Sequence, residues 1–535
     1  MTRLLPILFT AAAVAAPPVV EVYNAASLIP AATQNVAQGS MFVFSFTGTG
    51  IGPARRVQAG YPMPTTAGLA GLTLQANVGG AQAYPCILVY AAFEEVGAVL
   101  PSNVPLGDGQ LTLYYTPANG TVTGGPTAPI HVAPVSFGIY TVNGLGAGPA
   151  FLIDASGNSI DVTNTAHNGD TVSLRGTGLG KITDDETNPP PRVDLNSGAQ
   201  VFVGNQPATV LYGGRAGGRP GNDRVDFVVP DGVSGCYVSL WVKAGGMVSN
   251  FTSIPVTSAD QSACSDPALG ISGADLQPNV GGGLNVGVLD LTAVAGDQGD
   301  GRFNQFDLAT LTGSPSLATG PSIGSCIVYD YHGDAPGVPN LAPSPGLDAG
   351  PQLNVSGPPG AMRLAPDSKG SYTARLGGGG GGGRPPYLFP GVYTIDNGGG
   401  GADVGPFSVS ITIPTPVVWA NQPPLLGNIP RSQDLQITWS GGGPNDVVAI
   451  LGASVSPAVP NGLVGEFICT ANASDGHFTV PSDALANIPA TSLPVTAPTA
   501  LLAVGSFSSA RFTARGLDFG FVWSLLTTAQ LVVFQ

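Results

Sequence analysis

Apolar and polar residues alternate along short runs throughout this chain, which is the pattern of half-buried β-strands. Ser40–Phe46 and Phe407–Ile413 are two examples, and Gly, Pro, Asn or Asp bounds most such runs. Apolar residues at helical spacing are almost absent, and one short helix is predicted at Asp483–Asn487, with Ser482 as its N-cap. The pattern predicts an all-β fold made of β-sandwiches.

One segment of the chain occurs twice. Ser45–Gly52 reads SFTGTGIG, and 128 residues later Ser173–Gly180 reads SLRGTGLG. Each copy is followed by a Val-Gly strand end, at Val78-Gly79 and at Val203-Gly204, then by a proline before a turn and by an alternating strand. A period of this length indicates tandem domains, because solenoid repeats are usually about 20–50 residues long.

The strand runs and the glycine-rich stretches divide the chain into segments. The amino-acid composition changes after residue 260, where glycine runs occur at 281–283, 377–383 and 398–401. These runs predict flexible loops. We expect a signal peptide at 1–15, β-sandwiches at 20–133 and 134–257, a Gly/Pro-rich β domain at 265–414, and a C-terminal β-sandwich at 415–535.

The N-terminus has the features of a secretory signal. Arg3 supplies a positive charge, Leu4–Val14 is mostly apolar, and Ala13-Val14-Ala15 is a cleavage site of small residues. The run is shorter than the ~20 residues needed to span a bilayer. No later apolar segment reaches that length without interruption. The sequence therefore predicts a secreted or cell-surface protein with no transmembrane span after cleavage.

Composition narrows the functional classes. With 78 glycines, 50 prolines and 43% hydrophobic residues, the chain suits short strands joined by turns. Charged residues make up 10%, well below the usual ~25%, which disfavours coiled coils, helical bundles and typical cytosolic enzymes. Eighteen basic residues against 33 acidic ones give a net charge of −15, which argues against a nucleic-acid partner held through its phosphates.

The chain has five cysteines, and their spacing matches no zinc motif. An exported protein can hold disulfides. Cys236 with Cys264 is the first predicted pair, since the two flank one strand-rich segment, and Cys326 with Cys469 is the second. Cys86 is then left over and is expected to be a small buried side chain.

The duplicated part resembles a known family. The resemblance rests on Asn24-Ala25-Ala26-Ser27, the two Gly-Thr-Gly loops, Pro62–Thr66 and Asn77–Gly80, and it covers about residues 20–257. These features are similar to the Solibacter-type uncharacterised C-terminal domain of exported acidobacterial proteins. The resemblance implies tandem immunoglobulin-like sandwiches of the IPT/TIG type and an exported setting. It implies no activity and no functional residues.

Two clusters of oxygen-bearing side chains suggest calcium, which is held by six to eight oxygen ligands in a flexible loop. The first is Asp297, Asp300, Asn304 and Asp307; the second is Asp184, Asp185, Glu186 and Asn188. Neither has EF-hand spacing, and a solvated acidic loop is the alternative for both. Calcium is the one cofactor hypothesis for this chain.

Catalytic motifs are weak. Ser322 lies in a Gly-x-Ser-x-Gly pattern at 320–324, but a strand rather than a helix is predicted to follow it. The four histidines, His131, His167, His332 and His477, are scattered over different units. The glycine loops at 48–52 and 176–180 lack the following helix that a phosphate cradle needs, so tight turns are expected. We therefore predict no catalytic residues and a protein that is not an enzyme.

The leading functional hypothesis is an exported surface or extracellular protein for adhesion, interaction or a structural role, with an extracellular protein or polysaccharide as partner. The alternative is a protein that binds extracellular polysaccharide, in which aromatic side chains stack on sugar rings. The candidates for stacking are Trp241, Trp419, Trp439 and Trp523. Burial of these tryptophans in sandwich cores would count against that alternative.

Overall fold

The computed structural model describes residues 18–31, 33–80, 82–116, 120–266, 271–273, 283–293, 297–306, 320–332, 346–377, 385–456, 463–491 and 500–535. Strands are the dominant regular structure of these residues and helices are very few, so the predicted all-β class is confirmed. The predicted signal peptide at 1–15 lies outside them. No helix in the described ranges is long and apolar enough to cross a bilayer.

The first body, here sandwich 1, is made of two five-stranded sheets. One has the order β1-β3-β8-β7-β4 and the other β2-β10-β9-β5-β6. The alternating side chains of β3, Phe42, Phe44 and Phe46, point into a common core with the leucines of β5 and β9. The strands are β1 (Val19–Asn24), β2 (Val36–Ala37), β3 (Met41–Thr47), β4 (Val57–Gln58), β5 (Leu72–Val78), β6 (Ala83–Pro85), β7 (Ile87–Ala92), β8 (Glu95–Val99), β9 (Gly107–Tyr115) and β10 (Thr123–Ala133).

The second body, sandwich 2, wraps an eleven-stranded sheet around one core. β17 pairs with β18 on one side and with β16 on the other, and it carries a bulge between Val210 and Tyr212. A short parallel pairing occurs in both sandwiches, β2 with β10 and β13 with β21, as a duplicated domain would have. The strands are β11 (Gly138–Ile139), β12 (Leu152–Ile153), β13 (Ala166–His167), β14 (Thr171–Thr177), β15 (Val193–Asp194), β16 (Gln200–Val203), β17 (Gln206–Arg215), β18 (Asp223–Val228), β19 (Gly235–Ala244), β20 (Met247–Val248) and β21 (Thr252–Thr257).

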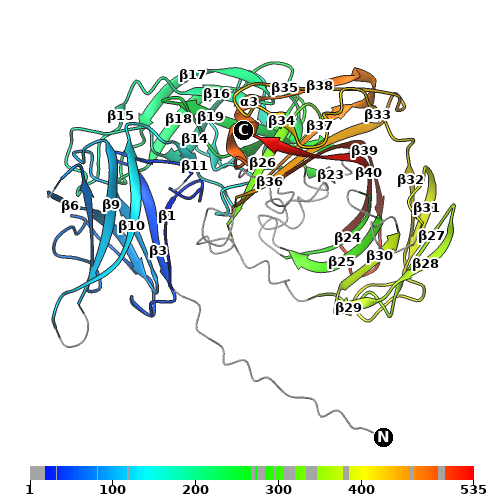
Figure 1. Ribbon diagram of the computed structural model, residues 1–535, viewed down its shortest axis with the longest axis horizontal. Helices are drawn as coiled ribbons and strands as arrows, with labels where there is room; N and C mark the ends of the chain where they lie inside the picture. Colours follow the sequence, from blue (N-terminus) through cyan, green and yellow to red (C-terminus); the bar gives the residue numbers. More distant parts are fainter. Residues whose placement is uncertain are drawn as a thin grey trace, which may run out of the picture.

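The described residues after Thr257 form the C-terminal body, which lies toward the right in Figure 1, on the side away from sandwich 1. Its ten-stranded sheet includes the path β26-β37-β36-β39-β40-β24-β25-β30-β29, and β28-β27-β31-β32 and β33-β35-β38 form smaller sheets. A two-stranded β22-β23 ladder precedes it. The elements are β22 (Ser265–Asp266), β23 (Ile271–Ser272), β24 (Leu284–Ala293), β25 (Asp297–Phe306), β26 (Cys326–His332), β27 (Leu353–Gly357), β28 (Gly360–Leu364), β29 (Pro366–Ser368), β30 (Ser371–Gly377), β31 (Gly391–Asp396), β32 (Ser408–Ile413), β33 (Val418–Trp419), β34 (Gly427–Ile429), β35 (Leu435–Ser440), β36 (Val447–Ser456), β37 (Leu463–Asn472), the 3-10 turn η3 (Ala473–Asp475), β38 (His477–Val480), α3 (Ser482–Asn487), β39 (Ala500–Phe512) and β40 (Phe519–Phe534).

The predicted division of this part into domains at 265–414 and 415–535 is wrong. β24 pairs in parallel with β40, from Val286 opposite Phe519 to Ala293 opposite Leu526. β26 likewise pairs with β37 from the other side of the expected boundary. Strands from both segments share one sheet, because β40, at 16 residues, is long enough to pair with β24 along its first half and with β34 near its end.

The predicted short helix is present, but its cap differs from the prediction. α3 begins at Ser482, and the N-cap position is Pro481, with no side-chain capping bond. The Ser482 amide instead donates to the Asp434 carboxylate. The predicted cysteine pairs are both disulfides, Cys236–Cys264 and Cys326–Cys469, and Cys86 is free and buried.

Candidate functional site at the junction of the two sandwiches

The first predicted calcium cluster does not converge. Asp297, Asp300 and Asn304 lie along the extended strand β25 rather than in a loop. At about 3.3 Å per residue, Asp297 and Asn304 are roughly 23 Å apart along the strand, which is too far for one ion. Asp307 lies outside the described residues. Within the described ranges, no group of three or more His, Cys, Asp or Glu side chains is placed to hold a metal.

The second acidic cluster splits into two parts with different roles. The Asp185 carboxylate accepts hydrogen bonds from Thr187 and Asn188, which lower its pKa and close the loop on itself. Glu186 turns inward, is 7% exposed, and accepts a 2.8 Å hydrogen bond from the Ser102 amide of sandwich 1. Burial raises the pKa of Glu186. The loop 181–188 is therefore a contact between the two sandwiches.

Ser322 has a structural role. Its hydroxyl donates to the buried Asp266 carboxylate at 2.9 Å and accepts from the Tyr237 amide at 3.0 Å. Asp266 also accepts from the Cys236 amide at 2.6 Å. β26 follows this turn, as predicted, so the nucleophile geometry of a hydrolase is not formed. The bonds fasten the turn at 320–325 to sandwich 2.

The tryptophans belong mainly to cores. Trp241, Trp419 and Trp439 are 1%, 6% and 5% exposed, and Trp523 is partly buried. The Trp241 ring stacks between Phe202 and Phe251, and its indole nitrogen donates to Asp483 on α3 at 3.1 Å. The row of exposed tryptophans that the polysaccharide alternative requires is therefore not formed by these residues.

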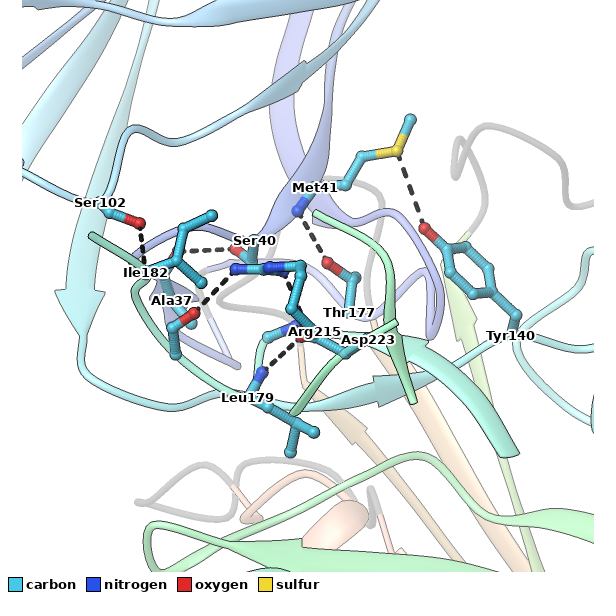
Figure 2. Close-up of polar contacts among 12 residues, drawn as sticks. Ala37, Ser40, Met41, Ser102, Tyr140, Thr177, Leu179, Ile182, Arg215 and Asp223 are labelled. Carbon is cyan, nitrogen blue, oxygen red and sulfur yellow. Dashed lines mark hydrogen bonds and ion pairs between the residues drawn. The ribbon is translucent and has the colours of Figure 1, made fainter. Parts of the chain in front are cut away.

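The joint between sandwiches 1 and 2 contains a fully buried ion pair, shown in Figure 2. Arg215 ends β17 and Asp223 begins β18, and the two residues are direct partners in the antiparallel ladder. Their side chains are 0% exposed, with 2.7 Å between Nη1 and Oδ1. The other carboxylate oxygen of Asp223 accepts from the amides of Gly178 and Leu179, at 2.7 and 2.8 Å.

These contacts explain why two charges can lie inside the protein. Burial raises the pKa of Asp223 to about 6, while Arg215 and the two amides oppose this shift, so the carboxylate is still ionised at neutral pH. Arg215 also donates to the Gly180 carbonyl at 2.9 Å. The repeated Gly-Thr-Gly-Leu-Gly turn is therefore held by the ion pair, and its glycines have positive φ angles of 109° at Gly178 and 127° at Gly180.

Hydrogen bonds cross the joint around this ion pair (Figure 2). The Met41 amide donates to the Thr177 hydroxyl at 2.8 Å, and the Ile182 amide donates to the Ser102 hydroxyl at 3.0 Å. The Tyr140 hydroxyl lies 3.7 Å from the Met41 sulfur. Backbone amides on each sandwich thus donate to side-chain hydroxyls of the other, which fixes the relative position of the two bodies.

A cleft of about 600 Å³ opens at this joint. Sandwich 1 and the loop 181–187 of sandwich 2 form its two walls. Hydroxyl, amide and carboxylate groups and one lysine share the lining with apolar groups in nearly equal parts. The residues are Thr65, Tyr84, Pro85, Ile87, Pro101, Ser102, Asn103, Lys181, Ile182, Thr183, Asp184, Asp185, Glu186 and Thr187. Such a mixed surface suits a partner that presents both polar and apolar groups.

Sequence reasoning did not find Arg215 and Asp223. The available signal was their position on either side of the turn 216–222, which contains three glycines and one proline and predicts a hairpin. In a hairpin the two residues become cross-strand partners. The oxygen-rich pattern at 184–188 predicts a metal site, whereas the structure makes this loop a wall of the cleft.

Comparison with known proteins gives little beyond the fold. The sequence matches no protein-family model and no curated protein. Among solved structures, a tetra-tandem repeat from the extending region of a large adhesion protein is similar, with 11% identity, 96% of this chain and 99% of that chain covered, and a TM-score of 0.15. The insect immune protein hemolin has 12% identity, 95% and 99% coverage and a TM-score of 0.12. TM-scores this low support no conclusion about function.

Proposed function

We propose that this protein is an extracellular, non-enzymatic interaction protein, in which the joined sandwiches present the junction cleft to a surface partner. The observation that supports this most is the buried Arg215–Asp223 pair at the joint. Both cleft walls come from bodies that this joint holds together, so the cleft has a fixed shape before any partner binds. Fixed shape lowers the ordering cost of association and favours a role in adhesion or structure.

The test is binding of the labelled, purified full chain to intact cells and to immobilised extracellular proteins. The cleft is blocked with Thr183→Trp, at an exposed wall position, and the matched control is Thr412→Trp on the exposed face of β32. We expect saturable binding that Thr183→Trp weakens at least tenfold and Thr412→Trp leaves unchanged.

Two results would contradict the proposal. Absence of saturable binding to every surface would remove the interaction role. Binding that is equally strong in the Thr183→Trp variant would show that the cleft is not the contact. Because Thr183 and Thr412 are both exposed threonines, a difference between the two variants cannot come from the added indole alone.

A further inference from the structure

Three arginines gather on one outer face of sandwich 2, although the chain has only 18 basic residues and a net charge of −15. Arg175 on β14 and Arg224 on β18 are direct partners in the antiparallel ladder, so their side chains leave the same face of the sheet. Arg192, just before β15, reaches the same place. We call Arg175, Arg192 and Arg224 the arginine face.

One buried carboxylate lies between two of these arginines. Asp226, whose side chain is 8% exposed, is 2.5 Å from Arg224 Nε and 3.3 Å from Arg192 Nη2. The side chains of Arg192 and Arg224 are 52% and 27% exposed, so both guanidinium groups also reach solvent. Two cations on one anion leave an excess of positive charge before Arg175 is counted.

Arg175 increases this excess. Among the residues that the structure describes, its guanidinium has no hydrogen-bond or ion-pair partner. Burial lowers its pKa most, and the charges of Arg224 and Arg192 lower it further, while the Asp226 carboxylate opposes this shift. Asp194, which lies near Tyr212 and accepts from the Asn196 amide, is a second carboxylate close to this face, so the three arginines still outnumber the two aspartates. An anion from outside would relieve the repulsion.

Aromatic rings lie beside the guanidinium groups. Phe151 is 40% exposed and adjacent to Arg175, whose amide donates to the Phe151 carbonyl at 3.2 Å. The Arg192 guanidinium lies 4.2 Å from the centre of the Tyr212 ring. A depression of about 260 Å³ borders Tyr212 and is also lined by Asn196 and by the carboxylate-bearing Asp194. The surface thus offers an apolar ring, an amide group and cations.

We propose that the arginine face binds the carboxylate or sulfate groups of an acidic polysaccharide. Guanidinium groups pair with oxyanions through two parallel N–H···O bonds, which suits both groups. The exposed Phe151 ring provides a platform for a sugar face, and the exposed Asn196 amide at the depression suits a sugar hydroxyl. These features favour a polysaccharide over an acidic peptide. The site goes beyond the proposed function, since none of its residues line the junction cleft.

The experiment measures retention of the full chain on four immobilised polymers: polygalacturonate, dextran sulfate, neutral dextran and polyglutamate. We expect saturable, salt-sensitive binding to polygalacturonate or dextran sulfate and none to dextran. Arg175→Gln should raise the Kd at least tenfold, and Phe151→Ser should raise it as well. The matched control is Arg363→Gln at an exposed position of β28, which should leave the Kd unchanged.

Among the described residues, the Arg175 guanidinium makes no hydrogen bond or ion pair, so its substitution should have little effect on folding. Unchanged circular dichroism of each variant checks this. Binding to neither acidic polysaccharide, equal binding by Arg175→Gln, or stronger binding to polyglutamate would each overturn the proposal. If cell-surface binding still depends on Thr183, only the arginine face fails. If polymer binding depends on Arg175 while no cell or protein surface is bound, only the proposed function fails.

Discussion

Replacement of Asp223 by alanine tests the account of the joint most directly. The change leaves the Arg215 guanidinium charged, 0% exposed, and with the Gly180 carbonyl as its remaining hydrogen-bond acceptor. Removing one partner of a buried ion pair lowers the free energy of unfolding by about 3–5 kcal/mol. The amides of Gly178 and Leu179 also lose their acceptor, and each buried unpaired donor costs about 1–3 kcal/mol. These losses are not additive, and we expect a local destabilisation of about 4 kcal/mol.

Hydrogen–deuterium exchange of the full chain measures this local destabilisation at individual backbone amides. The amides of Gly178 and Leu179 report on the joint. A tenfold change in the equilibrium constant for local opening corresponds to about 1.4 kcal/mol. Protection there should therefore fall roughly a thousandfold in Asp223→Ala. The double variant Arg215→Met with Asp223→Asn removes both charges. The side-chain amide oxygen at position 223 can still accept from the backbone amides, so most of the protection should return.

The control is an exposed ion pair of similar length. Lys369 and Asp403 are 2.9 Å apart, with side chains 63% and 37% exposed. Lys369→Met should cost less than about 1 kcal/mol, because solvent screens such pairs. If Asp223→Ala also costs less than about 1 kcal/mol, or if the double variant is no more protected than the single one, the pair does not hold the joint.

Three further predictions follow from particular contacts. The Cys326–Cys469 disulfide closes a separation of 143 residues, so its replacement by two serines should destabilise the C-terminal body by about 3–5 kcal/mol in urea unfolding; a loss below about 1 kcal/mol would contradict this. Burial raises the pKa of the Cys86 thiol, so a thiol reagent should label no cysteine in the native protein and one after denaturation without reductant, and rapid native labelling would show that the core is open. The Gln261 carbonyl lies 2.9 Å from one ring nitrogen of His167, and the Asp170 carboxylate lies 3.0 Å from the other. These two acceptors raise the pKa of His167, because only the protonated ring donates to both. Its contribution is therefore complete below its unfolded pKa of about 6.5 and lost as pH rises through the higher folded value; NMR titration should show that value, and one at or below 6.5 would refute it.

Strands and turns could be predicted because they depend on apolar–polar alternation and turn residues within a few positions of each other in the sequence. The strands predicted at 40–46 and 407–413 correspond to β3 and β32 within one residue at each end. Pairing between distant segments leaves no such pattern, so the partnership of β24 with β40 was not visible. Cys326 and Cys469 are an exception, since disulfide chemistry limits the choices to few pairings, and the two residues lie directly opposite each other in the ladder.

The candidate site was harder to predict for a different reason. Arg215 and Asp223 are charged residues in core positions, which hydrophobic periodicity marks as a break in the pattern. Their partners are backbone groups of the Gly-Thr-Gly-Leu-Gly turn, and the identity of side chains says little about such groups. For Asp297 and Asn304, composition indicated oxygen ligands, but the extended path of β25 decided their separation.

Because β24 pairs with the start of β40, the C-terminal sheet can be completed only late in synthesis on the ribosome. Domains generally fold as units as synthesis proceeds from the N-terminus. Sandwich 1 and sandwich 2 have all their strands by Thr257 and can close early. The C-terminal sheet lacks the strand between β39 and β24 until Phe519 and the residues after it have been made. Until then β24 and β39 are open edges that can pair with another chain, so a truncated product ending before Phe519 should aggregate while its two sandwiches remain folded.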